Sequence, residues 1–307
     1  MIDSPCSANS SDPAAQFYPP RKRINLADFG VGLFLFIFLP ALAFGLTAVF
    51  FEKTETLPSD ASFVSTGPMS TLSDSAEDLP TSNATDSSDS PSGTSDHAVV
   101  QLIRQDKSVW TIFLLFFMTC ILAPINEELL FRGTFQQSLE NAVFFQNESR
   151  FPASCAGWLT IIIPAILFSA IHLRVGNSNI DVQQLSIQLK CGALGHAFFA
   201  PLFLGWLQWV HGLRLVDVLG PISCWRSQIQ SGFLVFVLLL APVYAVQTVV
   251  TGILAYFQCG ICADPFSLLV LALGMGWLYY RYQTLLASIT LHLLFNATGL
   301  LAAYWLI

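Results

Sequence analysis

Long apolar runs, separated by shorter polar segments, dominate this chain. One run covers residues 29–51, and six more cover about 109–125, 157–173, 192–210, 232–257, 266–280 and 285–305. Most of these runs hold about 17–25 residues, the length that crosses roughly 30 Å of hydrocarbon as a helix. Backbone groups in lipid must form hydrogen bonds within their own segment, which favours helices. The pattern therefore predicts an all-α, polytopic membrane bundle of roughly seven transmembrane helices.

The first apolar run follows a short basic cluster. Arg21, Lys22 and Arg23 lie just before residues 29–51. A signal peptide has the same order of charges, but its apolar core is typically about 7–15 residues long. We therefore expect residues 29–51 to form an uncleaved N-terminal transmembrane anchor. Its basic end should lie in the cytoplasm, which makes residues 1–28 a cytoplasmic tail.

Residues 52–108 have a different composition, rich in Ser, Thr and Asp. Residues 52–107 hold ten acidic and three basic side chains, which accounts for the formal net charge of −7 of the whole chain. No apolar periodicity continues through this segment, so it cannot bury enough surface to offset its ordering entropy. We expect a disordered acidic loop after the first helix.

The composition narrows the class of protein further. Hydrophobic residues make up 54% of the chain and charged residues only 11%, against about 25% charged residues in a typical soluble domain. A soluble enzyme and a nucleic-acid-binding protein are therefore excluded. Seven cysteines are an odd number and do not suggest a disulfide framework. We expect a multi-pass integral protein of the plasma (inner) membrane, in contact with the lipid bilayer and without a nucleic-acid partner.

Few polar side chains interrupt the apolar runs of residues 109–307. Ionisable residues are costly inside a membrane and mark functional sites by default. The candidates are Glu127, Glu128, Arg132, His172, His196 and His292, with Asn296 as a buried amide. They define where the chemistry of this chain should be sought.

Two adjacent glutamates and an arginine form the first candidate cluster. Glu128 and Arg132 are four residues apart, so they can pair on one face of a helix. Glu127 lies about 100° round the helix and lacks that partner. A carboxylate without a neutralising partner near lipid is suited to general acid–base work. Pro124 removes a helical hydrogen bond just before this turn and predicts a kink. The alternative is an interfacial cluster that only anchors a helix end.

Phe168 and His172 form the second candidate, near the end of the run at 157–173. Four residues apart, they share a helix face. The polar loop at 147–152 would reverse the chain between this run and the helix that carries Glu127. An antiparallel hairpin that turns there places Glu127 and His172 at a similar membrane depth.

His292 and Asn296 form the third candidate, in the last apolar run. They too share one helix face, and apolar residues surround both. An unpaired polar group in lipid is expensive, so we expect both to point inward, toward Glu127 and His172. Together the three candidates predict an intramembrane protease. Glu127 would activate a water with help from His172, while His292 and Asn296 would stabilise the oxyanion.

The same residues resemble the motifs of a known family. EExxxR (Glu127, Glu128, Arg132), FxxxH (Phe168, His172) and HxxxN (His292, Asn296) are similar to the three motifs of the CPBP family. Its members include type II CAAX prenyl endopeptidases and Abi bacteriocin-immunity proteins. The resemblance covers about residues 109–307. It implies an intramembrane endopeptidase of the glutamate type, without a cofactor, that acts on a membrane-embedded or lipid-associated peptide.

The resemblance also implies a role for each motif residue. Glu127 and His172 would activate the water, and His292 and Asn296 would form the oxyanion site. Glu128, Arg132 and Phe168 would be supporting residues. One departure from the family is the 120-residue interval between His172 and His292, which predicts an insertion at about 174–262.

Several alternatives stay open at this point. A zinc protease could use His172, His292 and Glu127 as ligands, although no HExxH is present and Asn296 would then have no role. The polar cluster could instead stabilise a non-enzymatic immunity or binding scaffold. Haem ligation by the same two histidines is a third alternative. The Cys259-x-x-Cys262 pair is a weak zinc candidate, and His196 is interpreted as a packed histidine.

Overall fold

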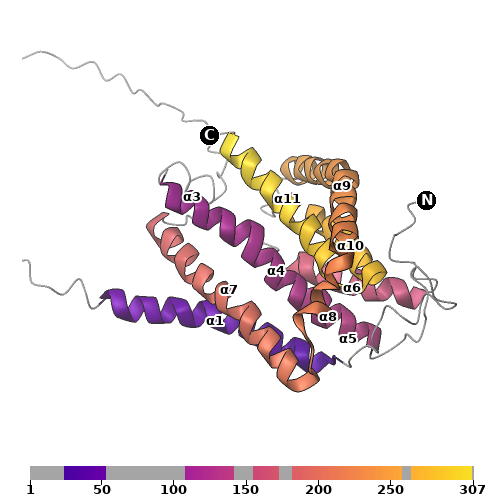
Figure 1. Ribbon diagram of the computed structural model, residues 1–307. Helices are drawn as coiled ribbons and strands as arrows, with labels where there is room; N and C mark the ends of the chain where they lie inside the picture. The colour runs from indigo at the N-terminus through magenta and orange to yellow at the C-terminus, as the bar shows by residue number, and fades with distance from the viewer. Residues whose placement is uncertain (1–23, 53–107, 142–154, 173–181, 258–263, 306–307) are drawn as a thin grey trace, which may run out of the picture.

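The computed structural model describes residues 24–52, 108–141, 155–172, 182–257 and 264–305 (Figure 1). Every regular element within these ranges is a helix, so the all-α prediction is confirmed. The α-helices are α1 Leu26–Glu52, α3 Val109–Phe116, α4 Ala123–Glu128, α5 Gln137–Leu139, α6 Cys155–Ile171, α7 Val182–His211, α8 Leu215–Leu219, α9 Ile222–Tyr256, α10 Asp264–Tyr282 and α11 Leu286–Trp305. The same stretch of chain contains the π-helical segments η1 Phe117–Leu122 and η2 Leu129–Gln136.

Several predictions fall outside the described residues. These are the basic cluster at 21–23, almost all of the acidic loop at 52–108, the turn at 147–152 and the CxxC at 259–262. The division into an anchor, a protease domain and an insertion at 174–262 also stays a prediction.

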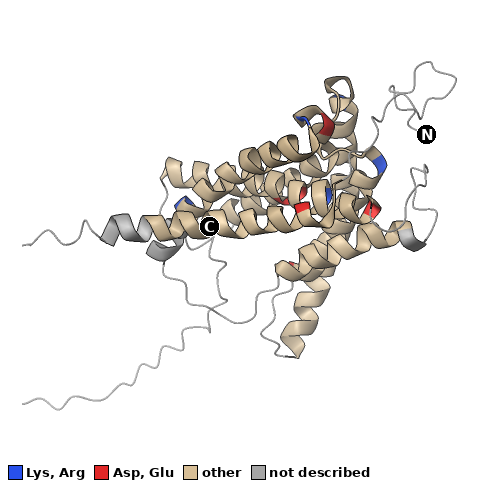
Figure 2. Cartoon of the chain, turned by 90° about the horizontal axis from the view of Figure 1, so that it is seen from below, with Lys and Arg blue, Asp and Glu red and all other residues tan. Residues whose placement is uncertain are grey.

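Within the described residues, five helical segments are long and apolar enough to cross a membrane. They are Leu26–Leu46, Val109–Leu139, Leu189–His211, Leu215–Tyr256 and Leu286–Trp305. The other two predicted spans are helices as well, the shorter apolar α6 and the 19-residue α10. Charged side chains are sparse along the ribbon (Figure 2). The chain is therefore a multi-pass membrane protein by length and composition.

By sequence, Asp217, Pro221 and Arg226 indicate a loop at 211–231 between two apolar runs. The structure shows that this region is mostly helical, so that prediction is wrong. Within it lie α8 and the start of α9. Asp217 belongs to the first turn of α8, where its Oδ2 accepts a hydrogen bond from the backbone N–H of the N-cap residue Arg214 (2.9 Å). Gly220, with φ of 82°, makes the turn between α8 and α9.

The helix that carries the two glutamates is continuous from Val109 to Leu139 but changes its hydrogen-bond register near Pro124. Proline has no N–H, so it cannot continue the α-helical ladder. Just before it, the N–H of Ala123 bonds to the carbonyl of Met118, five residues back. The predicted disturbance at Pro124 therefore takes the form of a π segment, a feature that is frequent at functional sites.

This long helix lies at the centre of the bundle. In Figure 1 it runs between the adjacent helices α1 and α7 on one side and α6, α10 and α11 on the other. In its η2 segment, Leu130 is 0% and Phe131 1% exposed. Both belong to a core cluster that also contains Phe168 of α6 and Phe203 of α7. The residues of the first motif are therefore enclosed by helices from distant parts of the chain.

Close crossing of α9 and α11 depends on Gly232. A Cβ atom there would lie 2.5 Å from the carbonyl oxygen of Ala287, so no side chain fits. We expect Gly232→Ala to lower the thermal unfolding midpoint in detergent by several degrees, since overpacking costs about 1–3 kcal/mol. Gly252→Ala is the matched control on the same helix, because no atom lies within 4 Å of its Cβ position. Equal midpoints for the two variants would contradict the close crossing.

Candidate active site

Glu128 and Arg132 form the buried ion pair that their spacing predicted. Glu128 Oε1 lies 3.5 Å from Arg132 Nη1, and both side chains are 0% exposed. Arg132 Nη2 also donates to the carbonyl of Ala272 in α10 (3.1 Å). The guanidinium lies 4.9 Å from the centre of the Phe168 ring, close enough for a cation–π contact. A charge pair this deeply buried needs such additional contacts to offset its desolvation.

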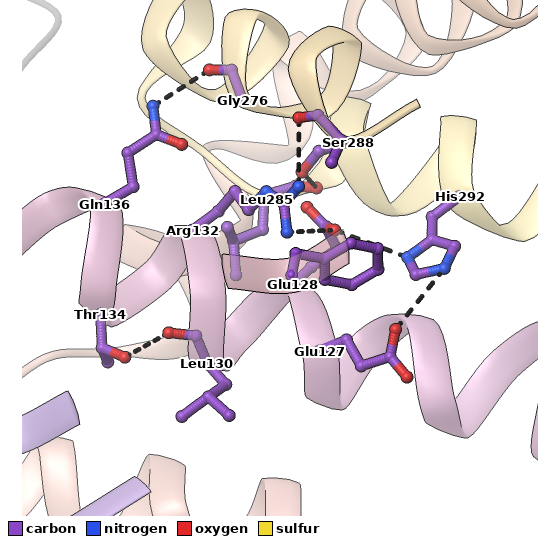
Figure 3. Close-up of polar contacts among 12 residues, drawn as sticks. Glu127, Glu128, Leu130, Arg132, Thr134, Gln136, Gly276, Leu285, Ser288 and His292 are labelled. Atoms are coloured by element: carbon purple, nitrogen blue, oxygen red, sulfur yellow. Dashed lines mark hydrogen bonds and ion pairs between the residues drawn. The ribbon is translucent and has the colours of Figure 1, made fainter. Parts of the chain in front are cut away.

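His292 lies between the two glutamates (Figure 3). Its Nδ1 is 3.5 Å from Glu128 Oε1, and its Nε2 is 3.7 Å from Glu127 Oε2. Glu128 is fully buried, whereas Glu127 keeps 14% of its side chain exposed. Of the two carboxylates, only Glu127 is therefore accessible to a reactant. The contact of α11 with α4 joins the first and third motifs in one cluster.

Phe168 connects this cluster to His172. Its ring centre lies 4.7 Å from that of His172 and 5.8 Å from that of His292. His172 Nδ1 is 2.7 Å from the carbonyl oxygen of Phe168. A carbonyl can only accept, so Nδ1 carries the hydrogen, and in the neutral ring Nε2 is the nitrogen with a free lone pair. In this tautomer the acceptor nitrogen of His172 is Nε2.

Asn296 lies one turn after His292 on α11, and its Nδ2 donates to the carbonyl of Thr119 (2.7 Å). Pro124 explains why that carbonyl is available. In an α-helix the Thr119 carbonyl would accept from the N–H of Ala123, but that N–H bonds to the carbonyl of Met118 instead. In a π-helix the donor would be residue 124, which is a proline and has no N–H. The disturbed register of η1 therefore creates the acceptor that fixes the Asn296 amide.

The structure links five motif residues in one chain of contacts. Both glutamates face His292, Arg132 pairs with Glu128, and Phe168 contacts Arg132 and His292. His172 adjoins this group through Phe168, and Asn296 adjoins it through its position one turn from His292. The two outer residues are held by backbone carbonyls rather than by the glutamates.

Sequence reasoning missed Asn126, which is fully buried beside Glu127. Its Nδ2 donates to His196 of α7, at Nδ1 (3.1 Å) and at the backbone carbonyl (2.8 Å). The sequence did show Asn126 as an uncharged amide within a long apolar helix, but among such amides only Asn296 was taken as a candidate. Ser288 was also missed. It is 0% exposed and precedes His292 by one helical turn (Figure 3).

Potential metal ligands do not converge in the part of the chain that the structure describes. No group of three or more His, Cys, Asp or Glu side chains there is arranged to hold a metal ion. The zinc arrangement of His172, His292 and Glu127 stays an alternative for experiment.

Comparison with known proteins agrees with the motifs. The family model described as Type II CAAX prenyl endopeptidase Rce1-like matches residues 109–220. The matched segment contains the first two motifs and ends before His292. The resemblance to CAAX prenyl endopeptidases is thereby confirmed over somewhat more than a third of the chain, and it indicates a membrane protease of the CAAX type. No curated protein and no solved structure gives a match.

Proposed function

We propose that this protein is an intramembrane CAAX-type endopeptidase in which Glu127 activates the hydrolytic water. The observation that carries the proposal is the contrast between two adjacent carboxylates. Glu128 is fully buried and paired with Arg132, whereas Glu127 is partly exposed and faces His292. A base must reach both its water and the substrate, and Glu127 alone meets that requirement.

In the proposed reaction, Glu127 removes a proton from water as the oxygen attacks the scissile carbonyl. His172 Nε2, with its free lone pair, shares that proton. An N–H at His292 Nε2 and the amide of Asn296 stabilise the oxyanion of the tetrahedral intermediate. The protonated carboxyl group of Glu127 then returns its proton to the leaving amine. Glu128 and Arg132 hold His292 in place and touch neither reactant.

The substrate follows from where the site lies. The glutamates are on a segment, Val109–Leu139, that is long and apolar enough to span a membrane. A peptide reaches such a site most readily when a lipid group holds it at the bilayer. A protein with a prenylated C-terminal cysteine motif meets this requirement and agrees with the family match.

Cleavage in a reconstituted system tests the proposal. The purified protein in phospholipid vesicles should release the C-terminal tripeptide from a prenylated CAAX peptide, as measured by mass spectrometry. The same peptide without its prenyl group is the matched control and should be cleaved much more slowly. Treatment with EDTA or phenanthroline should leave the rate unchanged, because no step uses a metal.

Two outcomes would contradict the proposal. Loss of cleavage on chelation, with recovery on adding Zn²⁺, would favour the zinc protease. Absence of any cleavage by folded protein across CAAX peptides with different end residues would favour the non-enzymatic scaffold.

A further inference from the structure

Asn126 and His196 join the helix of the glutamates to α7, 70 residues further along the chain. Both contacts come from one amide nitrogen: Asn126 Nδ2 donates to His196 Nδ1 (3.1 Å) and to the His196 carbonyl (2.8 Å). The Asn126 side chain is 0% exposed and belongs to the residue directly before Glu127. Neither residue has a part in the proposed chemistry.

The geometry fixes the protonation of the His196 ring. A backbone carbonyl only accepts hydrogen bonds, so the group of Asn126 that faces it must be the NH₂ end of the amide. The second hydrogen of that NH₂ group then points at His196 Nδ1, which must be the unprotonated nitrogen. The ring hydrogen is therefore on Nε2. Both hydrogen bonds therefore require one orientation of the Asn126 amide and one tautomer of the His196 ring.

His196 is itself held by the N-terminal helix. The ring of Phe36 in α1 meets the His196 ring edge to face, with centres 5.2 Å apart. Gly195 allows this approach, since a Cβ there would lie 2.6 Å from the backbone of Pro40. Asn126 is thus anchored to a close crossing of α1 and α7.

The turn that carries Glu127 needs such an anchor. The α4 segment has only six residues, Ala123–Glu128, and lies between two π segments. Its backbone ladder is therefore irregular at both ends. A tether at the preceding residue limits the rotation of this turn and so the position of the Glu127 carboxylate.

We propose that Asn126 and His196 are a positioning pair that aligns Glu127 with its water through the α1–α7 crossing. The inference rests on the proposed function, since it assigns the pair a role in that reaction. It also gives α1 and α7 a part in catalysis, although neither helix carries a residue of the three motifs.

A series of variants separates positioning from general stability. Asn126→Ala removes both hydrogen bonds and should lower kcat roughly tenfold with little change in KM, because alignment is lost and substrate binding is kept. His196→Phe removes only the ring acceptor and should lower kcat less. His196→Gln restores an acceptor for the same N–H and should recover most of the wild-type kcat.

Thr284→Val is the matched control. It removes another buried tertiary hydrogen bond, from Thr284 Oγ1 to Gln228 Oε1 (2.9 Å), which joins the turn before α11 to α9. It should lower stability without changing kcat of the folded protein. An equal loss of kcat in Thr284→Val and Asn126→Ala would overturn the proposal, and so would an unchanged kcat in folded Asn126→Ala.

A spectroscopic measurement covers the case in which Asn126→Ala does not fold. Nitrogen NMR of the ¹⁵N-histidine-labelled wild type, with the signal assigned through His196→Gln, should show the Nε2-protonated ring. A ring protonated at Nδ1 would overturn the pairing. If the pair variants keep full kcat while Glu127→Gln is inactive, only this inference fails. If Glu127→Gln is active, the proposed function itself fails.

Discussion

Glu127→Gln is expected to abolish peptide hydrolysis while leaving the protein folded. The amide has nearly the shape of the carboxylate but cannot accept a proton from water. Loss of a general base typically costs about 10²–10⁴-fold in rate, and the loss should appear in kcat rather than in KM. Because Glu127 is partly exposed and faces His292 at 3.7 Å, an amide can remain in contact with the ring. Cleavage of the prenylated peptide in vesicles measures the effect.

The matched control for this variant is Glu140→Gln on the same long helix. Glu140 is buried, and its Oε1 accepts a hydrogen bond from Gln136 Nε2 (3.3 Å), which an amide oxygen can still accept. Its activity should stay near that of the wild type. Activity of Glu127→Gln within a factor of two of the control would show that another group activates the water, or that the cluster is structural.

Arg132→Met is expected to destabilise the fold severely. It leaves the Glu128 carboxylate buried at 0% exposure without its cationic partner, and removing one partner of a buried pair typically costs about 3–5 kcal/mol. The hydrogen bond to the Ala272 carbonyl is lost as well. Unfolding of the purified protein by titration with sodium dodecyl sulfate, followed by circular dichroism, measures the change in the free energy of unfolding.

The double variant Arg132→Met with Glu128→Leu tests the cause. With both charges removed, no unpaired carboxylate remains, so the double variant should be more stable than Arg132→Met alone. It should still be impaired in cleavage, because His292 loses the group that faces its Nδ1. Stability losses that simply add would show that packing, and not the buried charge, accounts for the effect of Arg132→Met.

Local spacing was enough to predict the elements and the pairs that lie within one turn. Apolar runs of membrane-spanning length indicated helices, because lipid leaves the backbone no other partners. The four-residue interval between Glu128 and Arg132 predicted their pairing, because residues four apart lie side by side on one face of a helix. The loop prediction at 211–231 failed where polar residues cap helices, since a cap and a loop have similar composition.

Contacts between distant segments could not be derived in this way. His292 meets both glutamates, and Asn126 meets His196, only because several helices cross at one level of the bundle. Pattern and spacing report on one helix at a time, and they leave open which face of another helix lies opposite. The acceptor of Asn296 depends in addition on the register change at Pro124, a backbone detail of η1.

The amino-acid sequence by itself determined that this is an all-helical membrane protein with three short polar motifs, because apolar length and four-residue spacing act locally. Only the tertiary structure decided which glutamate is buried and which is accessible, since burial depends on the helices that surround a side chain. Glu127 and Glu128 are neighbours in sequence and of the same residue type, yet packing against α10 and α11 gives them different exposures and different partners.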